Sequence, residues 1–421
     1  MPTTQAIPPD APVRTRPFPR WPVYDERCCR AVTEVLLEGQ GNYWSGPQGR
    51  QFQEAFANYL SVNQAIAVAN GTCALHTALA ACGVGPGDQV ITPAYSFVAS
   101  STSVLNQGAL PVFADIDPVT HCIDPSDIEA KITPRTQAIV CVHLYGHACD
   151  MDAIMAIASR HKLCVIEDCA QAHGGEYKGR KLGSIGHAGA YSFCQEKIIS
   201  TGGEGGMVTT NDGRIAELAA MVRDHGFDEQ ERIELKRAGS LYQYFHHRMG
   251  YNFRMTNMQA ALGLVLLEGL DDNVAQRRRN AYTLNNLLGD CEFCTLPHDS
   301  DQIKHAYYQY TVTLDLEKLT VDRDTFVKAV QAQGVPAGLG NTPENYLEQI
   351  FTKRMGFAAS GFPFTDPTHH ADIQDYHPGM CPVAHHLGQR TFRLKVHPTC
   401  GQQEMQDTAD ALKVVYQRYG K

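Results

Sequence analysis

Short apolar runs alternate with helix-like segments from about residue 25 to residue 270, and this alternation constrains the fold more than any other feature of the chain. Segments such as 74–82 and 151–161 consist of good helix formers. Short, largely apolar strands joined by helices are typical of a mostly parallel sheet that helices cover on both faces. We therefore predict an α/β fold with strands at 64–69, 88–92, 111–115, 138–143, 163–167 and 189–193.

The pattern changes after residue 270. Residues 276–279 lie in a polar helix, and Tyr308–Leu314 alternates as a strand exposed on one side. Residues 340–380 show no clear periodicity, and a long irregular stretch in a compact protein is usually functional or mobile. This half of the chain indicates a smaller α+β domain.

The N-terminal segment has a different character, with six prolines among its first 20 residues. Proline blocks helix formation, so we expect an extended arm that packs on a partner subunit. The predicted organisation is an arm at 1–24, a large α/β domain at 25–270 and a small α+β domain at 271–421.

Composition excludes several classes of protein. The formal net charge of −9 argues against a nucleic-acid partner. No apolar run approaches the roughly 18 residues that a membrane helix needs, and no targeting segment is visible. We therefore expect no membrane contact and, by default, a cytoplasmic location.

The cysteines and histidines do not indicate a metal site. The chain is too long for a small disulfide scaffold, and its 14 cysteines are expected to be unbonded thiols. Cys291 and Cys294 form one C-x-x-C pair, but a structural zinc site needs two further ligands, and none is evident nearby. Adjacent histidines usually point apart, so a histidine pair seldom makes a site.

Lys197 is the first candidate for chemistry. It follows an apolar strand, Gly189–Phe193, and precedes a cluster of glycines at 202–206. A lysine presented at a strand end can attack a carbonyl and form an imine, and glycines let backbone pass close to a flat ligand. A surface lysine before a flexible loop would give the same pattern, so this feature alone decides nothing.

Asp168 ends an apolar strand and should lie at the carboxyl edge of a parallel sheet, where α/β proteins place ligands. A carboxylate there can pair with a protonated pyridine nitrogen, whose charge makes pyridoxal phosphate an electron sink. The alternative is an aspartate that caps the following helix.

A phosphate site is suggested by Asn70-Gly71-Thr72-Cys73, at a strand-to-helix turn. Backbone N–H groups at the helix start and the Thr72 hydroxyl suit a phosphate, and Ser192 could add a second donor. An aromatic side chain in Pro93–Phe97 could stack on a pyridine ring. Many helices begin in this way without binding a phosphate. An aromatic residue in Pro93–Phe97 is also more often part of the hydrophobic core than of a ligand site.

Seven segments in a fixed order make the resemblance specific. Together they resemble the DegT/DnrJ/StrS aminotransferases, which make amino sugars and aminocyclitols, over roughly residues 20–340 and more loosely beyond. The segments are N-G-T-C-A-L, P-A-Y-S-F-V-A-S, V-H-L-Y-G, E-D-C-A-Q-A-H-G, Y-S-F-C-Q-E-K, G-G-E-G-G and G-Y-N-F-R-M-T-N-M-Q-A-A-L-G.

The resemblance implies fold type I of the pyridoxal-phosphate enzymes and a homodimer with sites at the subunit interface. Lys197 matches the Schiff-base lysine that forms the internal aldimine, and Asp168 matches the carboxylate on the pyridine nitrogen. The remaining matches are Phe97 stacked on the ring, Gln171 beside the phenolic oxygen, Gly71, Thr72, Cys73 and Ser192 around the phosphate, and Asn252 reaching the phosphate from the neighbouring subunit.

The implied reaction transfers an amino group from glutamate or glutamine to a keto-sugar or ketocyclitol. Nucleotide-linked keto-sugars, free keto-sugars and ketocyclitols all stay open as acceptors. Three alternatives are a non-catalytic or regulatory homologue, a sugar dehydratase, in which histidine replaces the lysine, and a nicotinamide-dependent oxidoreductase. The last needs a G-x-G-x-x-G after an early strand, which this chain lacks.

Three departures from the family pattern concern the acceptor. His147 stands where the family often has glutamine, and Arg393 and Lys395 add two cations to a run that is usually apolar. These cations could meet a substrate phosphate or only a surface carboxylate. The segment 377–382 is similar to the Pro-Gly-x-Cys-Pro of the aminocyclitol branch.

Overall fold

The computed structural model describes residues 11–421 except 243, 290, 341–342 and 368–372. The first ten residues of the expected arm and part of the irregular 340–380 stretch therefore lie outside the described residues. No helix in the described ranges is long and apolar enough to cross a membrane.

A seven-stranded sheet forms the centre of the larger part of the molecule, in the order β1-β9-β8-β5-β4-β2-β3. Six of the seven strands run in the same direction and only β9 is reversed, so the predicted mostly parallel sheet is confirmed. The strands are β1 (Gln64–Val68), β2 (Gln89–Pro93), β3 (Leu110–Ala114), β4 (Thr136–Val142), β5 (Cys164–Asp168), β8 (Ala188–Ser192) and β9 (Gly206–Thr210).

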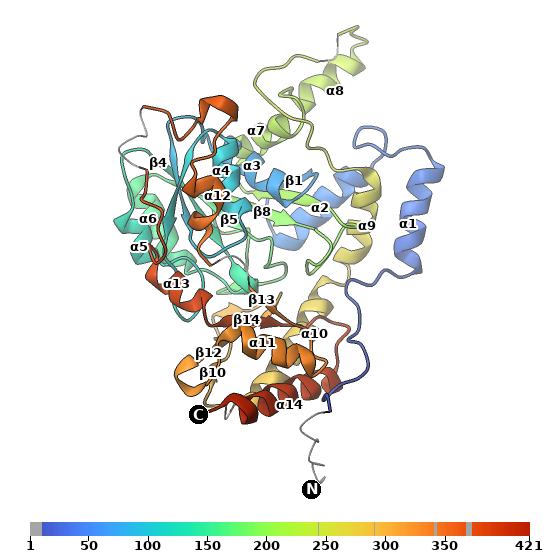
Figure 1. Cartoon of the computed structure of the whole chain (residues 1–421). Coiled ribbons are helices and arrows are strands. Elements are labelled where there is room, and N and C mark those ends of the chain that lie inside the picture. The colour runs from blue at the N-terminus through green and yellow to red at the C-terminus, as the bar shows by residue number, and fades with distance from the viewer. Residues whose placement is uncertain (1–10, 243, 290, 341–342, 368–372) are drawn as a thin grey trace.

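Helices flank this sheet, as Figure 1 shows, and they account for its apolar strands. The strands β2, β3, β8 and β9 are buried along their whole length, so both of their faces exclude water. The helices are α1 (Glu26–Leu37), α2 (Gln48–Leu60), α3 (Gly71–Ala81), α4 (Ala99–Asn106), α5 (Pro125–Ala130), α6 (Met151–His161), α7 (Gly213–Arg223) and α9 (Asn257–Leu267).

A second, four-stranded antiparallel sheet has the order β10-β12-β14-β13 and its own core. Its strands are β10 (Cys294–Thr295), β12 (Tyr310–Leu314), β13 (Ala337–Leu339) and β14 (Thr391–Leu394), packed with α10 (Leu270–Leu288), α11 (Arg323–Ala332) and α14 (Gln402–Tyr419). A small sheet joins β6 (Glu176–Tyr177), β7 (Arg180–Lys181) and β11 (Ile303–Lys304). Short 3-10 turns lie at Leu144–Gly146, Leu316–Lys318, Asn345–Leu347 and Ala358–Ser360.

The strand expected at 308–314 is present, but its predicted one-sided exposure is wrong. β12 lies between β10 and β14, and four of its five residues are buried. Tyr310 and Val312 pack in the smaller core, and Thr311, which points to the opposite face of the strand, is also buried, so both faces are covered.

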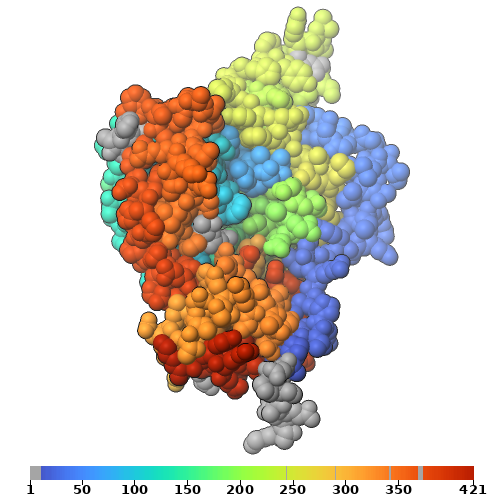
Figure 2. Space-filling view, in the orientation of Figure 1, coloured from blue at the N-terminus to red at the C-terminus, as the bar shows by residue number. Residues whose placement is uncertain are grey.

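The described part of the irregular stretch packs on the larger core. It includes α12 (Gln349–Thr352) and is followed by α13 (Pro382–Gly388), and its orange surface lies against the larger domain in Figure 2. Tyr346 and Phe351 are buried in that core, and the Asn345 N–H donates to the Ala94 carbonyl over 2.9 Å. The predicted boundary at residue 270 stays a prediction, and this segment contributes to the larger core although it lies beyond that boundary.

The described part of the N-terminal arm packs on its own chain. The buried Arg14 forms ion pairs with Glu404 over 2.9 Å and with Asp407 over 2.6 Å. Trp21 Nε1 donates to the Lys197 carbonyl over 3.0 Å. The arm therefore supports the loop that carries Lys197, and its contact with a partner subunit stays a prediction.

Candidate active site

A cavity of about 770 Å³ lies where the carboxyl ends of β5 and β8 meet the start of α3 and the smaller domain. It contains eight of the nine predicted site residues, which come from four separate parts of the chain. They are Gly71, Thr72, Cys73, Phe97, Asp168, Gln171, Ser192 and Lys197. The structure thus brings these side chains together, while their individual roles stay predictions.

Asp168 is the last residue of β5 and is almost fully buried. Its Oδ2 accepts a hydrogen bond from Ser100 Oγ over 2.8 Å, and its Oδ1 accepts one from the Ala170 N–H over 3.1 Å. Burial raises the pKa of Asp168, although these hydrogen bonds and the charge of Lys197 act in the opposite direction. In the described part of the chain Asp168 has no ion-pair partner, so a cationic group of a ligand would be favoured here.

The neighbouring Glu167 points away from the cavity and holds the strand in place. Its carboxylate accepts hydrogen bonds from the N–H groups of Gly183, Ile185 and Gly186 and from His143 Nε2. Burial opposes ionisation of Glu167, but these donors outweigh it and keep its pKa below the ordinary value.

His143, Glu167 and Cys169 lie close enough together to hold a metal ion. The His143 ring is already used on both sides, because Nδ1 accepts from the Cys149 N–H over 3.1 Å while Nε2 faces Glu167 over 3.0 Å. With four donors on its carboxylate, Glu167 also has its hydrogen-bonding capacity filled. This arrangement is typical of a structural network, and the expectation of no metal stays a prediction.

The start of α3 lies against Ser192 with no room for a side chain between them. A Cβ on Gly71 would come within 2.5 Å of the Ser192 Cβ, so glycine is required for this approach. The Asn70 side chain caps the helix by accepting from the Cys73 N–H over 2.9 Å. Helix starts leave backbone N–H groups without intrahelical partners, and here they lie beside a serine hydroxyl, which is an arrangement that suits a phosphate.

Lys197 lies in the loop after β8. Its backbone N–H donates to the Cys194 carbonyl over 3.0 Å, and Trp21 holds its carbonyl. Its Nζ lies 4.8 Å from the centre of the Tyr308 ring. Tyr308 lines the cavity but was not predicted, because no motif in the sequence distinguishes it from a core aromatic residue.

Gln171 and Phe97 complete the wall. Gln171 Oε1 accepts a hydrogen bond from the Tyr145 N–H over 2.8 Å, which fixes the orientation of its amide. Phe97 is 60% exposed, an unusual state for a phenylalanine that lines a cavity, and its ring is free to contact a flat ligand. His76, whose ring contacts Tyr251, also lines the cavity and gave no signal in the sequence.

Asn252 is the one predicted residue that does not line this cavity. It is exposed, and its backbone pairs with that of Asp224. Two residues further along the chain, Arg254 forms an ion pair with Asp224.

His147 is buried outside the cavity, with Nδ1 2.8 Å from the Ala148 carbonyl oxygen. His147 is therefore not part of the lining of this cavity, although its position departs from the family pattern.

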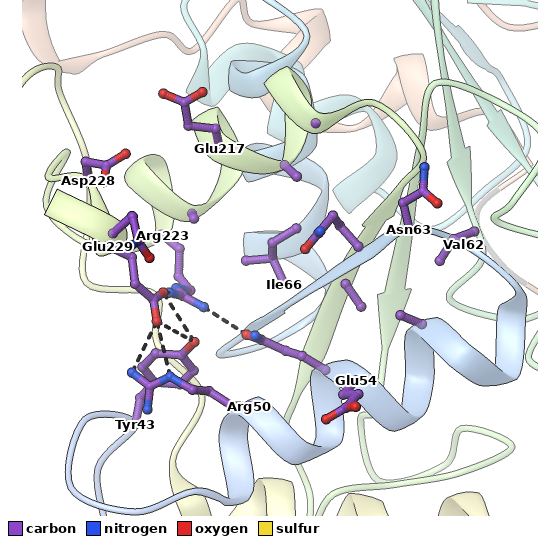
Figure 3. Close-up of a pocket in the computed structure, with 18 of the residues that line it drawn as sticks. Tyr43, Arg50, Glu54, Val62, Asn63, Ile66, Glu217, Arg223, Asp228 and Glu229 are labelled. Carbon is purple, nitrogen blue, oxygen red and sulfur yellow. Dashed lines mark hydrogen bonds and ion pairs between the residues drawn. The ribbon is translucent and has the colours of Figure 1, made fainter. Parts of the chain in front are cut away.

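A second cavity, of about 660 Å³, lies between α2, β1, α7 and α8 (Glu229–Arg237), and Figure 3 shows its lining. Glu229 forms ion pairs with Arg50 over 3.1 Å and with the fully buried Arg223 over 3.0 Å. The Tyr43 ring lies beside both arginines. Because these charges are paired with one another, the cluster anchors α8 to the body of the protein. From there α8 and the loop after it project outward in Figures 1 and 2.

Comparison with known proteins decides the family. Residues 22–413 match the DegT/DnrJ/EryC1/StrS aminotransferase family. The chain belongs to this family. It is thus an enzyme of the aminotransferase class with the fold predicted from its sequence, a large α/β domain followed by a smaller α+β region.

Relatives across this aminotransferase family share most of the chain. GDP-perosamine synthase of Caulobacter vibrioides is 43% identical over 76% of this chain and 83% of its own. The L-glutamine:2-deoxy-scyllo-inosose aminotransferase of Streptomyces lividus is 38% identical over 95% of this chain and 94% of its own. The solved aminotransferase of Psychrobacter cryohalolentis is 42% identical, with a TM-score of 0.87 over 96% of this chain and 99% of that one.

Proposed function

We propose that this aminotransferase holds pyridoxal phosphate around Lys197 and transfers an amino group from glutamate or glutamine to a keto-sugar or ketocyclitol. One observation carries the proposal: Lys197, Asp168 and the start of α3 reach a single cavity from separate parts of the chain. A pyridine ring that carries an aldehyde and a phosphate needs an amine, a carboxylate and an anion site, and these three features supply them.

The residues present fit that cofactor. Asp168 is a buried carboxylate without a cationic partner among the described residues, and a protonated ring nitrogen would provide one. The close approach of Gly71 to Ser192 leaves a cradle of backbone N–H groups and a hydroxyl for the phosphate. Phe97 offers an exposed aromatic face on the same cavity.

When bound, the cofactor stabilises negative charge that develops at a substrate carbon. Asp168 would keep the ring nitrogen protonated, and Ser100 fixes the carboxylate for that task. Lys197 Nζ would hold the cofactor until an amino donor displaces it. The freed amine then takes a proton from the donor Cα and returns a proton during the second stage, as general base and general acid.

The acceptor class follows from the relatives, whose names mention a GDP-linked amino sugar and a deoxy-inosose. A homodimer with shared sites is also proposed. Asn252 is exposed and lies outside the cavity of its own chain, a position that supports a contact with the phosphate site of a neighbouring subunit.

Absorption spectroscopy of the purified protein tests this function. We expect a visible band that shifts when L-glutamate or L-glutamine is added, and an amine product when keto-sugars and ketocyclitols are then supplied in turn. A protein without a visible band, or a band that no amino donor changes, contradicts the proposal and would favour a non-catalytic homologue. Conversion of the acceptor without transfer of nitrogen would indicate a dehydratase.

A further inference from the structure

The structure separates the two cations that depart from the family pattern. Lys395 Nζ lies 3.9 Å from Glu196 Oε1, and Lys395 is not part of the lining of the larger cavity. Arg393 lines that cavity together with Lys197. Only Arg393 is therefore placed to meet a substrate.

The Arg393 side chain passes over a glycine on the neighbouring strand. Arg393 lies on β14 and pairs with Thr311 of β12 and Gly338 of β13. A Cβ at position 338 would lie 3.5 Å from Arg393 Nε and 3.8 Å from its Cγ. The side chain thus runs over Gly338, and a larger residue there would occupy the space that it crosses.

Within the ranges that the structure describes, the Arg393 guanidinium has no hydrogen bond and no ion pair. A partly buried guanidinium carries five N–H donors in a planar fork, and the groups that match this fork are carboxylates and phosphates. An anionic group of a substrate would supply the missing acceptors.

The surroundings of Arg393 point to a group close to the reacting atoms. Burial raises the pKa of the Tyr95 hydroxyl, and the positive charges of Arg323 and Arg393 act in the opposite direction. Tyr145 Oη donates to Tyr95 Oη over 3.1 Å, and the Tyr145 N–H donates to Gln171, three residues after Asp168. These hydrogen bonds connect Tyr95 to Gln171, which lines the same cavity as Arg393 and Lys197.

We infer that Arg393 binds the α-carboxylate of the amino donor, which makes it a specificity-determining residue for the first half of the reaction. In an amino acid this carboxylate is one bond from the carbon that bears the reacting amine, so its binding group must lie near Lys197. In a nucleotide-linked sugar the phosphate is attached through the anomeric oxygen, so several bonds separate it from a carbonyl on the ring. The inference rests on the function proposed above.

Three related amino donors show which carboxylate Arg393 binds when the first half-reaction is measured without an acceptor. L-glutamate carries both carboxylates, L-isoglutamine has an amide in place of the α-carboxylate, and L-glutamine has an amide in place of the γ-carboxylate. The shift of the visible band gives the half-saturating concentration for each. In the wild-type protein we expect L-isoglutamine to require about 10 to 100 times the concentration of L-glutamate, the loss expected for one charge-assisted pair.

Arg393→Gln should raise the half-saturating concentration of L-glutamate by a similar factor and bring the two donors within about threefold of each other. Lys395→Gln, which removes a cation two residues away, should leave the ratio unchanged. Because Lys keeps the charge but not the fork, Arg393→Lys should recover part of the preference. Circular dichroism and cofactor content confirm that each variant is folded and loaded.

Other results overturn the inference. Equal use of L-glutamate and L-isoglutamine by the wild-type protein does so without any variant. An Arg393→Gln protein that keeps the donor ratio, but needs more of a nucleotide-linked acceptor, would assign Arg393 to a phosphate instead. A preference that follows the γ-carboxylate would assign it to the other end of the donor. If no donor shifts the band of the wild-type protein, it is the proposed function that fails.

Discussion

Ser100 Oγ donates a hydrogen bond to Asp168 Oδ2 over 2.8 Å, and this contact connects α4 to the end of β5. It fixes the orientation of a carboxylate that burial alone would favour in its neutral form. The protein therefore keeps at the floor of its cavity a group whose charge is costly without a ligand and useful with one.

Asp168→Asn should separate stability from activity. The pKa of Asp168 is raised in the folded protein, so the folded state holds this proton more tightly than the unfolded state. The protonated Asp168 carboxyl therefore contributes stability that is fully present below its pKa in the unfolded state. This contribution is lost as the pH rises through its pKa in the folded state. At neutral pH the cofactor-free Asn variant should be at least as stable as the cofactor-free wild type in urea unfolding.

The same variant should lose transamination by about 100-fold or more, because the ring nitrogen loses its anionic partner. Ser100→Ala, which removes only one hydrogen bond to that anion, should cost about tenfold. Full activity of the Asn variant, or a cofactor-free Asn protein clearly less stable than wild type at neutral pH, would contradict this role for Asp168.

Glu167→Gln should destabilise the protein by about 2–4 kcal/mol although Glu167 does not line the cavity. The new amide NH₂ would face N–H donors that now point at a carboxylate oxygen, such as those of Ile185 and Gly186. Urea unfolding of the two proteins measures the difference. Glu217→Gln changes an exposed carboxylate on α7 in the same way and should have little effect. Equal stability of both variants would show that the network around Glu167 is not needed.

Gly71→Ala should weaken cofactor retention, since its Cβ would come within 2.5 Å of the Ser192 Cβ and push the helix start away from β8. The cofactor left after dialysis measures this. Adding Ser192→Gly should relieve the clash in part, whereas Gly213→Ala, where the space is open, should change nothing. Normal retention in the Gly71→Ala protein would contradict the cradle.

A mixture of two inactive variants tests the shared site. Lys197→Ala removes the amine of one subunit, and Asn252→Ala removes the proposed phosphate contact to the other. A mixed dimer has one site with both residues intact, so random reassociation of equal amounts should restore about a quarter of wild-type activity. Activity no higher than the mean of the separate variants would place each site within one chain.

Much of the fold could be predicted from local patterns. Strand and helix positions in the larger domain agree within two or three residues with the prediction, and α6 agrees at both ends. These elements are buried on both faces or have strong side-chain caps, such as Asp150 at the start of α6, so their sequences alone specify them. The strand β9 was not predicted, because it begins at the end of the glycine cluster 202–206, which favours a loop.

The site was predictable where a motif marks it and not where only tertiary packing does. Lys197 and Asp168 stand in segments that resemble a family, and the structure brings them to one cavity. Tyr308 and His76 reach that cavity from ordinary core segments. For Arg393 the sequence showed an extra cation but left its partner open, because the strand that carries it faces the cavity only when the two domains are packed together.

The most direct test of the account is the site of covalent attachment. Borohydride reduction of the purified holoprotein, followed by proteolysis and mass spectrometry of the peptides, locates the lysine that holds pyridoxal phosphate. We expect a reduced pyridoxyl group on Lys197 and its absence after pretreatment with excess amino donor. A label on any other lysine, or no label on a protein that still transaminates, would contradict it.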